Sequence, residues 1–371
     1  MIAPLRRKRI VFAGGGTGGH IYPALAVARA LPAFDSLFLV PDDRGDAERV
    51  GGEFPILPMP CPRPDKGRIL YPARLALAVR RARGLLRAAD AAAVVGLGGY
   101  AALPASLAAR TLGLPLYLME CNAVPGRATR VLARFAAGIG LGTPGALGRL
   151  GARRSCRVTG TPLRAELRRP ARPEEFGLSR GVPTLLVLGG SQGAQGLNAK
   201  VVEGVRASSD LEFQVLHCAG ESDAPRVVDA YRGIPVRAAV LDFLSDIGRA
   251  YAVADLVLAR AGASTVAECV ALEKPAVFVP YPWHRDRQQT RNAEAVVRTG
   301  GALLVDERDL SPLAFRGIVE GVLSSAAARA RMAALLAGLA RPDAAREMAA
   351  HLVESLGDAM AEGSWLAEMG E

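Results

Sequence analysis

The chain has 371 residues, of which 50% are hydrophobic and 22% are charged, so its composition is that of a folded globular protein and not of a disordered one. Its 46 lysines and arginines outnumber 36 acidic residues, and the net charge of +10 suggests an anionic partner: a phosphorylated substrate, a membrane surface or a nucleic acid. The five cysteines are scattered and include no CxxC pair, which argues against a disulfide framework or a zinc site and fits a reducing cytosol. No apolar run reaches the ~18 residues of a membrane span, so we expect a soluble, cytoplasmic protein, and its length favours two domains.

The first motif is a glycine-rich turn near the N-terminus. Residues 10–13 predict a buried strand, residues 14–19 contain five glycines, and the apolar spacing that follows predicts a helix over 23–31. The free N–H groups and positive dipole end of such a helix favour a phosphate or an anionic transition state above the turn. The spacing Gly14-x-Gly16-x-x-Gly19, with Asp42 or Asp43 after the next strand, also fits a dinucleotide site, and a tight turn without a ligand stays open.

Strands and helices continue to alternate up to about residue 160. The pattern predicts strands at 37–40, 92–97 and 114–119 and a helix at 104–112, which together indicate a parallel α/β sheet. Ligands of such sheets bind at the carboxyl ends of the strands. Four polar residues stand at these predicted strand ends, although Asn122 fits a structural cap equally well: His20, Tyr100, Glu120 and Asn122.

A basic amphipathic segment interrupts this alternation. Residues 63–87 hold eight basic residues against one acid, interleaved with leucine, isoleucine and valine. Such a segment is typical of a helix that binds the surface of a membrane. An ordinary surface helix with its arginines in water is an equally good interpretation. A nucleic-acid site is a third, but no aromatic-rich RNA module or zinc-finger pattern accompanies the segment.

The second half repeats the first after an Arg-, Pro- and Gly-rich linker at 160–181. A predicted strand at 184–188 runs into a second glycine-rich turn, Gly189–Ala194, and a helix follows from Leu197. Further strands are predicted at 212–217, 236–239, 256–258 and 276–279. We therefore predict two doubly wound α/β domains in tandem, with anionic substrates held between them.

Two polar clusters lie in this second half. In the segment 260–268, backbone N–H groups and the hydroxyls of Ser264 and Thr265 are placed for phosphate, and Glu268 is placed for ribose hydroxyls. Thr265 followed three residues later by Glu268 is equally the pattern of a helix capping box. The loop 280–289 is dense in side chains that hydrogen-bond sugars. His217 and His351 have no polar company, and we expect them to be structural.

Seven motifs, in this order and spacing, resemble the MurG family of bacterial glycosyltransferases: GGGTGGHIYPALAVA, GLGGY, MECN, GTPLR, GGSQGA, RAGASTVAE and DRQQTRNA. The resemblance covers roughly residues 8–345 and implies an α/β GT-B fold, with two Rossmann-like domains whose parallel sheets face a central cleft. It implies an acceptor- and membrane-associating domain over 1–160, joined by a C-terminal helix at about 342–371, and a donor domain over 161–341.

The resemblance also implies a reaction and a location. The family performs an inverting transfer of N-acetylglucosamine (GlcNAc) from UDP-GlcNAc to lipid I, with no cofactor and no metal. The C4 hydroxyl of the lipid-linked N-acetylmuramyl (MurNAc) unit attacks the anomeric carbon, and the product is lipid II. The implied location is peripheral, on the cytoplasmic face of the cell membrane. The implied partners are the two substrates, an anionic membrane surface and candidate cell-wall synthesis proteins, with no nucleic acid.

Carried over to this chain, the family's sites fall on definite residues. His20 is the first candidate for the general base, because the ordinary imidazole pKa of about 6.5 suits proton transfer, and Glu120 is the second. The implied donor site comprises Thr17, Gly18, Gly19, Asn122, Arg164, Ser191, Leu244, Ala263, Ser264, Thr265, Glu268, Gln288 and Gln289. The implied acceptor site comprises Gly14, Gly15, Gly16, Gly98, Gly99 and Tyr100. The implied membrane contacts are Arg68, Leu75, Arg80, Arg81 and Arg83.

The chain departs from the family at two motif positions and leaves two other functions open. Cys121 stands where the family often has Gln, and Ser264 where it often has Leu; neither change removes a side chain that the reaction needs. A UDP-GlcNAc 2-epimerase would share the fold and the donor but need no acceptor. A non-catalytic sensor would bind the nucleotide sugar and tolerate the loss of His20.

Overall fold

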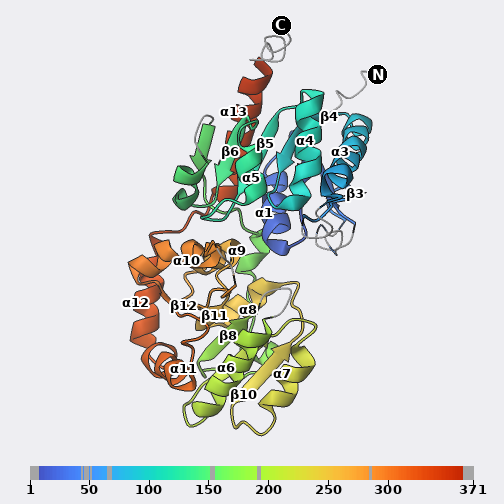
Figure 1. The fold of residues 1–371 in the computed structure, drawn as a ribbon. Coiled ribbons are helices and arrows are strands. Elements are labelled where there is room, and N and C mark those ends of the chain that lie inside the picture. Colours follow the sequence, from blue (N-terminus) through green and yellow to red (C-terminus); the bar gives the residue numbers. More distant parts are fainter. Residues whose placement is uncertain are drawn as a thin grey trace, which may run out of the picture. The chain divides into compact units, whose positions relative to one another are not determined.

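The computed structural model describes residues 8–42, 45, 50, 52–64, 69–150, 155–189, 194–283 and 286–361. The chain divides into two compact units, Met1–Arg164 with Asp343–Glu371, and Ala165–Pro342 (Figure 1). The functions assigned to these two parts from the sequence stay predictions. Each unit is a parallel α/β sheet with helices on both faces, so the predicted fold class is confirmed.

The described strands of the first unit form one parallel sheet in the order β3-β2-β1-β4-β5-β6-β7. These strands are β1 (Arg9–Ala13), β2 (Asp35–Pro41), β3 (Ile56–Met59), β4 (Ala91–Gly96), β5 (Leu116–Glu120), β6 (Gly138–Leu141) and β7 (Ser155–Val158). Its helices are α1 (Gly18–Arg29), α3 (Tyr71–Ala88), α4 (Leu103–Leu112), α5 (Arg127–Leu132) and α13 (Ala344–Ala361), with short 3₁₀ turns η1 (Tyr100–Ala102) and η2 (Pro144–Arg149).

Alternate residues of strand β1 supply the two faces of this sheet. Val11 and Ala13 pack into a core that α3, α4 and α5 cover, whereas Ile10 and Phe12 pack into a core covered by α1 and α13. A strand buried on both faces reads as a continuous apolar run, which is why residues 10–13 were recognisable from the sequence.

Helix α13 returns from the end of the chain to the first unit and runs beside β5 and β6, in red in Figure 1. Two glycines of β6 allow this close approach, because a Cβ at Gly138 would collide with Ser355 and one at Gly140 would lie 2.8 Å from Met348 Cγ. At the buried contact, Tyr117 Oη lies 2.8 Å from His351 Nδ1. His351 therefore has a structural place, in agreement with the sequence interpretation.

The described strands of the second unit form a parallel sheet in the order β10-β9-β8-β11-β12-β13. They are β8 (Thr184–Leu188), β9 (Gln214–Cys218), β10 (Arg237–Leu241), β11 (Leu256–Ala259), β12 (Ala276–Phe278) and β13 (Ala302–Leu304). The helices are α6 (Gln195–Ala207), α7 (Ala224–Tyr231), α8 (Ile247–Val253), α9 (Ala263–Ala271), α10 (Gln288–Thr299), α11 (Pro312–Ile318) and α12 (Ala326–Ala337). The linker carries the 3₁₀ turns η3 (Ala165–Arg168) and η4 (Pro173–Phe176), and a π-helical turn, Val319–Leu323, continues α11.

The two sheets share one strand order. In each, the first strand lies between the second and the fourth, so that the direction of winding reverses between β1 and β4 and again between β8 and β11. Crevices at such reversal points are where open α/β sheets bind ligands. The first glycine-rich turn follows β1, and Gly189, where the second begins, follows β8, so both positions lie at these points.

One predicted boundary is wrong in a way that affects the site. Helix α1 begins at Gly18 and not at residue 23, because the carbonyl of Thr17 already accepts the N–H groups of His20 and Ile21. Pro23 lies inside the helix, and together with the glycines it hides the helix start from sequence reasoning. His20 consequently lies in the first turn of α1.

Candidate active site

In the first unit, the β1–α1 turn holds a histidine at the start of a helix. Gly14, Gly15 and Gly16 are buried, Thr17 is the N-cap of α1, and His20 is half-buried. Thr17 Oγ1 lies 2.9 Å from His20 Nδ1, which fixes the imidazole and leaves Nε2 as the catalytic candidate. When Nδ1 carries the hydrogen and donates it to Thr17, Nε2 has the lone pair of a base.

The second glycine turn, after β4, supplies space beside this ring. Gly98 and Gly99 adopt positive φ angles of 87° and 67°, which favour glycine. A Cβ at Gly98 would lie 3.7 Å from His20 Nε2, and one at Gly99 would lie 3.9 Å from it. Any longer side chain would approach the His20 ring, so the second turn lies beside the histidine of the first.

Glu120 ends strand β5 and is almost completely buried. Its Oε1 accepts hydrogen bonds from the backbone N–H and from Nδ2 of Asn122, each at 3.0 Å. Its Oε2 accepts from the N–H of Gly126 at 3.1 Å and from Thr129 Oγ1 at 2.8 Å. Glu120 thus accepts four hydrogen bonds from the β5–α5 loop and the start of α5, and these bonds fix the loop. This geometry favours a positioning role for Glu120 over that of general base.

Gly98 lies near both His20 and the hydrogen bonds around Glu120. A Cβ at Gly98 would lie 3.6 Å from Thr129 Oγ1 on one side and 3.7 Å from His20 on the other. The structure thus brings together His20, Thr17, the second glycine turn and the Glu120–Asn122 pair, as the four strand-end residues suggested.

Two arginine–tyrosine contacts in this unit were not found from the sequence. Arg63 Nε donates to Tyr100 Oη at 3.1 Å, which fixes the tyrosine that follows the second turn. The guanidinium of Arg164 lies 3.8 Å from the ring centroid of Tyr22, so the motif arginine stacks on helix α1. The partners are distant in sequence, and no periodic pattern relates them.

In the second unit, Ser191, a predicted donor-site residue, falls outside the described residues, but Gly189 before it is described. The N–H of Gly189 donates to the carbonyl of Cys218 at 3.2 Å. Behind it, Asn198 Nδ2 donates to Ala219 O at 3.0 Å and to Asp223 Oδ2 at 2.7 Å, and Asn198 Oδ1 lies 3.1 Å from His217 Nε2. This buried network joins β9, α6 and α7, so His217 is structural, in agreement with the sequence.

The capping-box interpretation of Thr265 and Glu268 is wrong. The N-cap of α9 is Gly262, no side chain caps it, and Thr265 is already inside the helix. Glu268 is buried and accepts a hydrogen bond from Tyr251 Oη at 2.8 Å. Burial and the neighbouring Glu268 carboxylate raise the pKa of Tyr251 well above its ordinary value, so the phenol stays protonated and donates. At the start of α9, Ala263 and Ser264 are half-buried.

Arg260 links several loops at the reversal point of this sheet. Its Nη1 donates to the carbonyls of Val279 and Pro280, each at 3.1 Å, and its Nη2 pairs with Glu307. A Cβ at Gly196 would collide with the same Glu307 carboxylate, so the pair also contacts the first turn of α6. Sequence reasoning assigned no role to Arg260 or Glu307, because their partners are carbonyls and a loop carboxylate.

Two of the remaining donor candidates, Gln288 and Gln289, begin helix α10. Gln289 Oε1 accepts from the N–H of Tyr281 at 2.8 Å, and the N–H of Gln288 donates to Asp286 Oδ1 at 3.2 Å. Leu244 is half-buried in the segment between β10 and α8. Within this unit, the described donor candidates thus gather at the carboxyl ends of the strands.

Comparison with known proteins identifies the family. The model of the glycosyltransferase family 28 N-terminal domain matches residues 10–141, and that of the family 28 C-terminal domain matches residues 184–348. A Streptomyces avermitilis protein named UDP-N-acetylglucosamine--N-acetylmuramyl-(pentapeptide) pyrophosphoryl-undecaprenol N-acetylglucosamine transferase is 40% identical over 331 residues, covering 85% of this chain and 89% of that protein. The chain belongs to glycosyltransferase family 28. A Nitratidesulfovibrio vulgaris protein of the same name is 37% identical, covering 94% of this chain and 98% of its own length.

A solved structure extends the comparison to three dimensions. The crystal structure of Acinetobacter baumannii MurG is 28% identical to this family 28 chain, with a TM-score of 0.73, and covers 92% of this chain and 98% of that one. The resemblance to the MurG family is therefore confirmed, and so are the GT-B fold and the glycosyltransferase class.

The residues predicted to contact a membrane occupy different positions on α3. Arg80 and Arg81 are exposed, Leu75 is half-buried, and Arg68 falls outside the described residues. Arg83 is half-buried and its Nη1 lies 3.5 Å from the carbonyl of Thr111, so it contacts α4 and not only water. Three large apolar side chains near the arginines are exposed, by 94%, 56% and 69%: Ile69, Leu70 and Leu77.

The family 28 structure also bears on metals and membranes. Within the described ranges, no three His, Cys, Asp or Glu side chains gather as they would to hold a metal ion. In that same part of the chain, no helix is both long and apolar enough to cross a membrane.

Proposed function

We propose that the protein transfers GlcNAc from UDP-GlcNAc to the C4 hydroxyl of MurNAc in lipid I and so makes lipid II. The observation that carries the proposal is the extent of the similarity. Relatives named for this transfer are 37–40% identical over both units, and one is covered over 98% of its length. Such coverage favours the same donor and acceptor over a shared fold alone.

The second unit binds the donor in this proposal. Two helix N-termini, of α6 and α9, follow the strands β8 and β11, and their N–H groups and dipoles attract the diphosphate. Glu268, oriented by Tyr251, accepts from the ribose hydroxyls, and Gln288 and Gln289 hydrogen-bond the sugar. These fixed dipoles stabilise the leaving UDP electrostatically, so the reaction needs no metal ion.

The first unit binds and activates the acceptor. The C4 hydroxyl lies at His20 Nε2, in the space that Gly98 and Gly99 leave, and gives its proton to that nitrogen as its oxygen attacks the anomeric carbon. The C4 oxygen forms the new bond on the face opposite UDP, the bond to the diphosphate oxygen breaks, and the configuration inverts. Thr17 orients the ring, and Glu120 holds the loop that carries Asn122.

The exposed face of α3 supports peripheral binding to the cytoplasmic face of the membrane, where lipid I would be available. Leu77 is 69% exposed beside the exposed Arg80 and Arg81, a combination that suits an anionic lipid surface. Replacing Arg80 and Arg81 by Gln should weaken binding to anionic vesicles more than replacing Arg83, which contacts Thr111. Equal losses for the two variants would contradict this orientation of α3.

The test is transfer of labelled GlcNAc from UDP-GlcNAc to a short-prenyl lipid I analogue in the presence of EDTA. Product with the β configuration, at the same rate with and without EDTA, would support the proposal. Incubation with the donor alone is the control, because an epimerase would convert it without any acceptor. Conversion of the donor alone, or tight donor binding with no transfer, would overturn the proposed function.

A further inference from the structure

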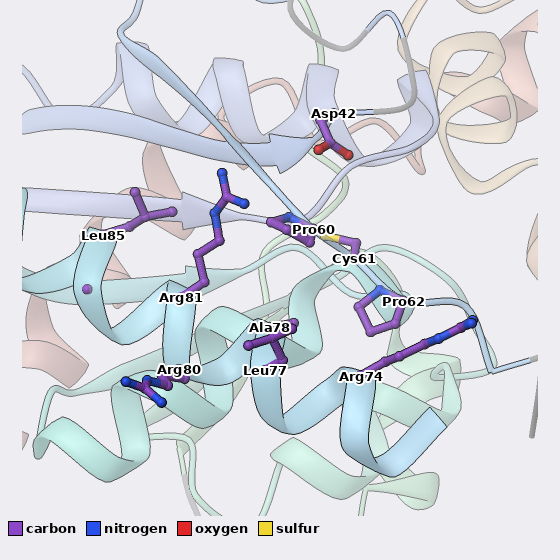
Figure 2. A pocket seen from close by; sticks show the side chains of 11 residues that line it. Asp42, Pro60, Cys61, Pro62, Arg74, Leu77, Ala78, Arg80, Arg81 and Leu85 are labelled. Atoms are coloured by element: carbon purple, nitrogen blue, oxygen red, sulfur yellow. The ribbon is translucent and has the colours of Figure 1, made fainter. Parts of the chain in front are cut away.

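A hollow of about 790 Å³ lies beside helix α3 in the first unit, and we call it the α3 hollow (Figure 2). Its walls include Pro60 and Pro62, from the segment after β3, and Leu77 and Gly84 of α3. This volume falls within the range of about 300–1,000 Å³ that is usual for small-molecule sites. The apolar walls suit a hydrocarbon group.

Charged side chains border these apolar walls, and most of them are positive. Figure 2 shows Arg81 rising from α3 toward the side of Pro60 and Asp42, Arg74 extending past Pro62, and Arg80 pointing away from both. Asp42 is the acid among the residues that line the hollow. Three lining arginines against one carboxylate leave the border positive, which complements an anionic group attached to the hydrocarbon.

The α3 hollow is joined to the proposed acceptor site by direct contacts. Cys61, which lines the hollow, has its Sγ 3.5 Å from the carbonyl oxygen of Ala101 and 3.4 Å from that of Met59, within reach of its thiol hydrogen. Two residues later, Arg63 donates to Tyr100 Oη at 3.1 Å. Tyr100 directly follows Gly99, whose Cβ position lies 3.9 Å from His20 Nε2. The wall of the hollow and the turn beside the proposed base are therefore one packed structure.

We propose that the α3 hollow holds the first isoprene units of the acceptor's polyprenyl chain. The inference rests on the proposed function and adds a subsite to it. With the sugar at His20, the diphosphate lies along Tyr100 and Arg63, and the prenyl chain enters the hollow next to Arg81 and Arg74. The protein then recognises the lipid of its acceptor itself, in addition to any attraction to the membrane surface.

A substitution at Gly84 tests the subsite without removing any contact. Gly84 is exposed, lines the hollow, and has nothing within 4 Å of a Cβ placed on it. Gly84→Leu therefore fills part of the hollow while it favours the helix, since leucine is a better helix former than glycine. Ala76→Leu is the matched control, because Ala76 is an exposed residue of the same helix that does not line the hollow.

The experiment measures KM for lipid I analogues with a methyl, geranyl or geranylgeranyl chain, in detergent solution without membranes. For the wild-type protein and Ala76→Leu, we expect KM to fall by about tenfold from the methyl to the geranylgeranyl acceptor, which corresponds to about 1.4 kcal/mol. For Gly84→Leu the ratio should be about one, with a melting temperature at or above that of the wild type.

Three results would overturn the subsite. The first is a wild-type KM that does not depend on chain length, and the second is a Gly84→Leu protein that keeps the full dependence. The third is loss of binding to anionic phospholipid vesicles in Gly84→Leu with unchanged dependence on prenyl length, which would assign the hollow to a membrane lipid. Absence of transfer to every acceptor, by contrast, would contradict the proposed function and not the subsite alone.

Two substitutions that each remove one positive charge from α3 give an independent check. Arg81→Gln removes a positive charge from the border of the hollow, and Arg87→Gln removes one from the exposed end of the same helix, outside it. We expect the KM for the geranylgeranyl acceptor to rise several-fold in Arg81→Gln only. An equal rise in both variants would indicate a general effect of charge and would contradict the subsite.

Discussion

The two units have the same strand order but different chemistry at the point where the winding reverses. In the first, a histidine that can gain or lose a proton is held by Thr17 beside two glycines that leave space. In the second, the permanently charged Arg260 is tied to Glu307 and to two carbonyls, and Glu268 is oriented by a tyrosine that stays protonated. At these points one unit therefore presents an imidazole, and the other presents an arginine–carboxylate pair and a buried carboxylate. Mutations in the first should affect kcat, and mutations in the second should affect KM for the donor.

The largest effect is expected for His20→Ala. Loss of a general base typically lowers the rate by about 10²–10⁴-fold, so we expect kcat to fall by about a thousandfold while KM for UDP-GlcNAc changes little. The measurement is steady-state transfer to a soluble lipid I analogue, with Thr17→Val as a milder companion that keeps the ring but removes its hydroxyl partner. A His20→Ala protein that lost donor affinity and kept kcat would make His20 a phosphate ligand instead.

The second prediction concerns the fixed charges of the second unit. Arg260→Met breaks its bonds to Val279, Pro280 and Glu307, and it should raise KM for UDP-GlcNAc by about 10–100-fold, because hydrogen bonds to charged groups are worth about 1.5–3 kcal/mol. Glu307→Gln should raise this KM less. The double variant should have the same KM as Arg260→Met, since the two residues act through one ion pair.

The matched control is Arg316→Met in the same unit. Arg316 also pairs with a carboxylate, Asp210, and donates to the carbonyl of Ala207, but it does so at the far end of helix α6 from Gly196. It should lower stability by a similar amount without changing KM. If the Arg260 and Arg316 variants raised KM for UDP-GlcNAc equally, the Arg260–Glu307 pair would stabilise the fold without a specific effect on donor binding.

The sequence predicted the fold well because both sheets are buried on both faces. Strands β1 and β8 are continuous apolar runs, each followed by glycines, and these two features fixed the repeat of the whole architecture. Shorter strands such as β6, with the sequence Gly-Ile-Gly-Leu, were missed. Its glycines look like a turn, and they are explained only by helix α13 packing closely against the strand.

The candidate site was predicted less completely, because motifs report residues and not partners. His20, Glu120 and Glu268 were found from their positions at strand and helix ends. Their hydrogen-bond partners, Thr129 for Glu120 and Tyr251 for Glu268, lie on other helices. No regular sequence spacing links either partner to its carboxylate, so the motifs do not predict these contacts. Tertiary contacts therefore favour a positioning role for Glu120 and exclude the helix cap for Glu268.

The third prediction separates Glu120 from His20 within the first unit. Glu120→Gln replaces one accepting oxygen by an NH₂ group that faces existing donors, so it should disturb the β5–α5 loop and cost about 1–3 kcal/mol of stability. We expect kcat to fall by about tenfold. The decrease of kcat at low pH, which we assign to protonation of His20, should remain. Loss of that decrease together with a fall in kcat as large as for His20→Ala would identify Glu120 as the base.

The smallest effect tests a histidine that has no catalytic role. Burial lowers the pKa of His217 to about 3, with the Asp223 carboxylate opposing the shift and Arg226 adding to it, whereas an unfolded histidine titrates near its ordinary value of 6.5. Between these values the unfolded chain binds more protons, so stability must fall as the pH drops below about 6.5 and stay level above it, by at most about 1.4 kcal/mol per pH unit.

His217→Gln removes this titration and isolates it from that of His351, whose pKa burial also lowers. Urea unfolding at pH 7 and pH 5 should show a larger loss of stability in the wild type than in the variant, by at most about 2 kcal/mol. The transfer activity of the variant should keep the pH profile that we assign to His20, because the hydrogen bonds of His217 go to Asn198 and Tyr231. A change in that profile would mean that His217 also takes part in the proton transfer, and the assignment of this step to the first unit alone would fail.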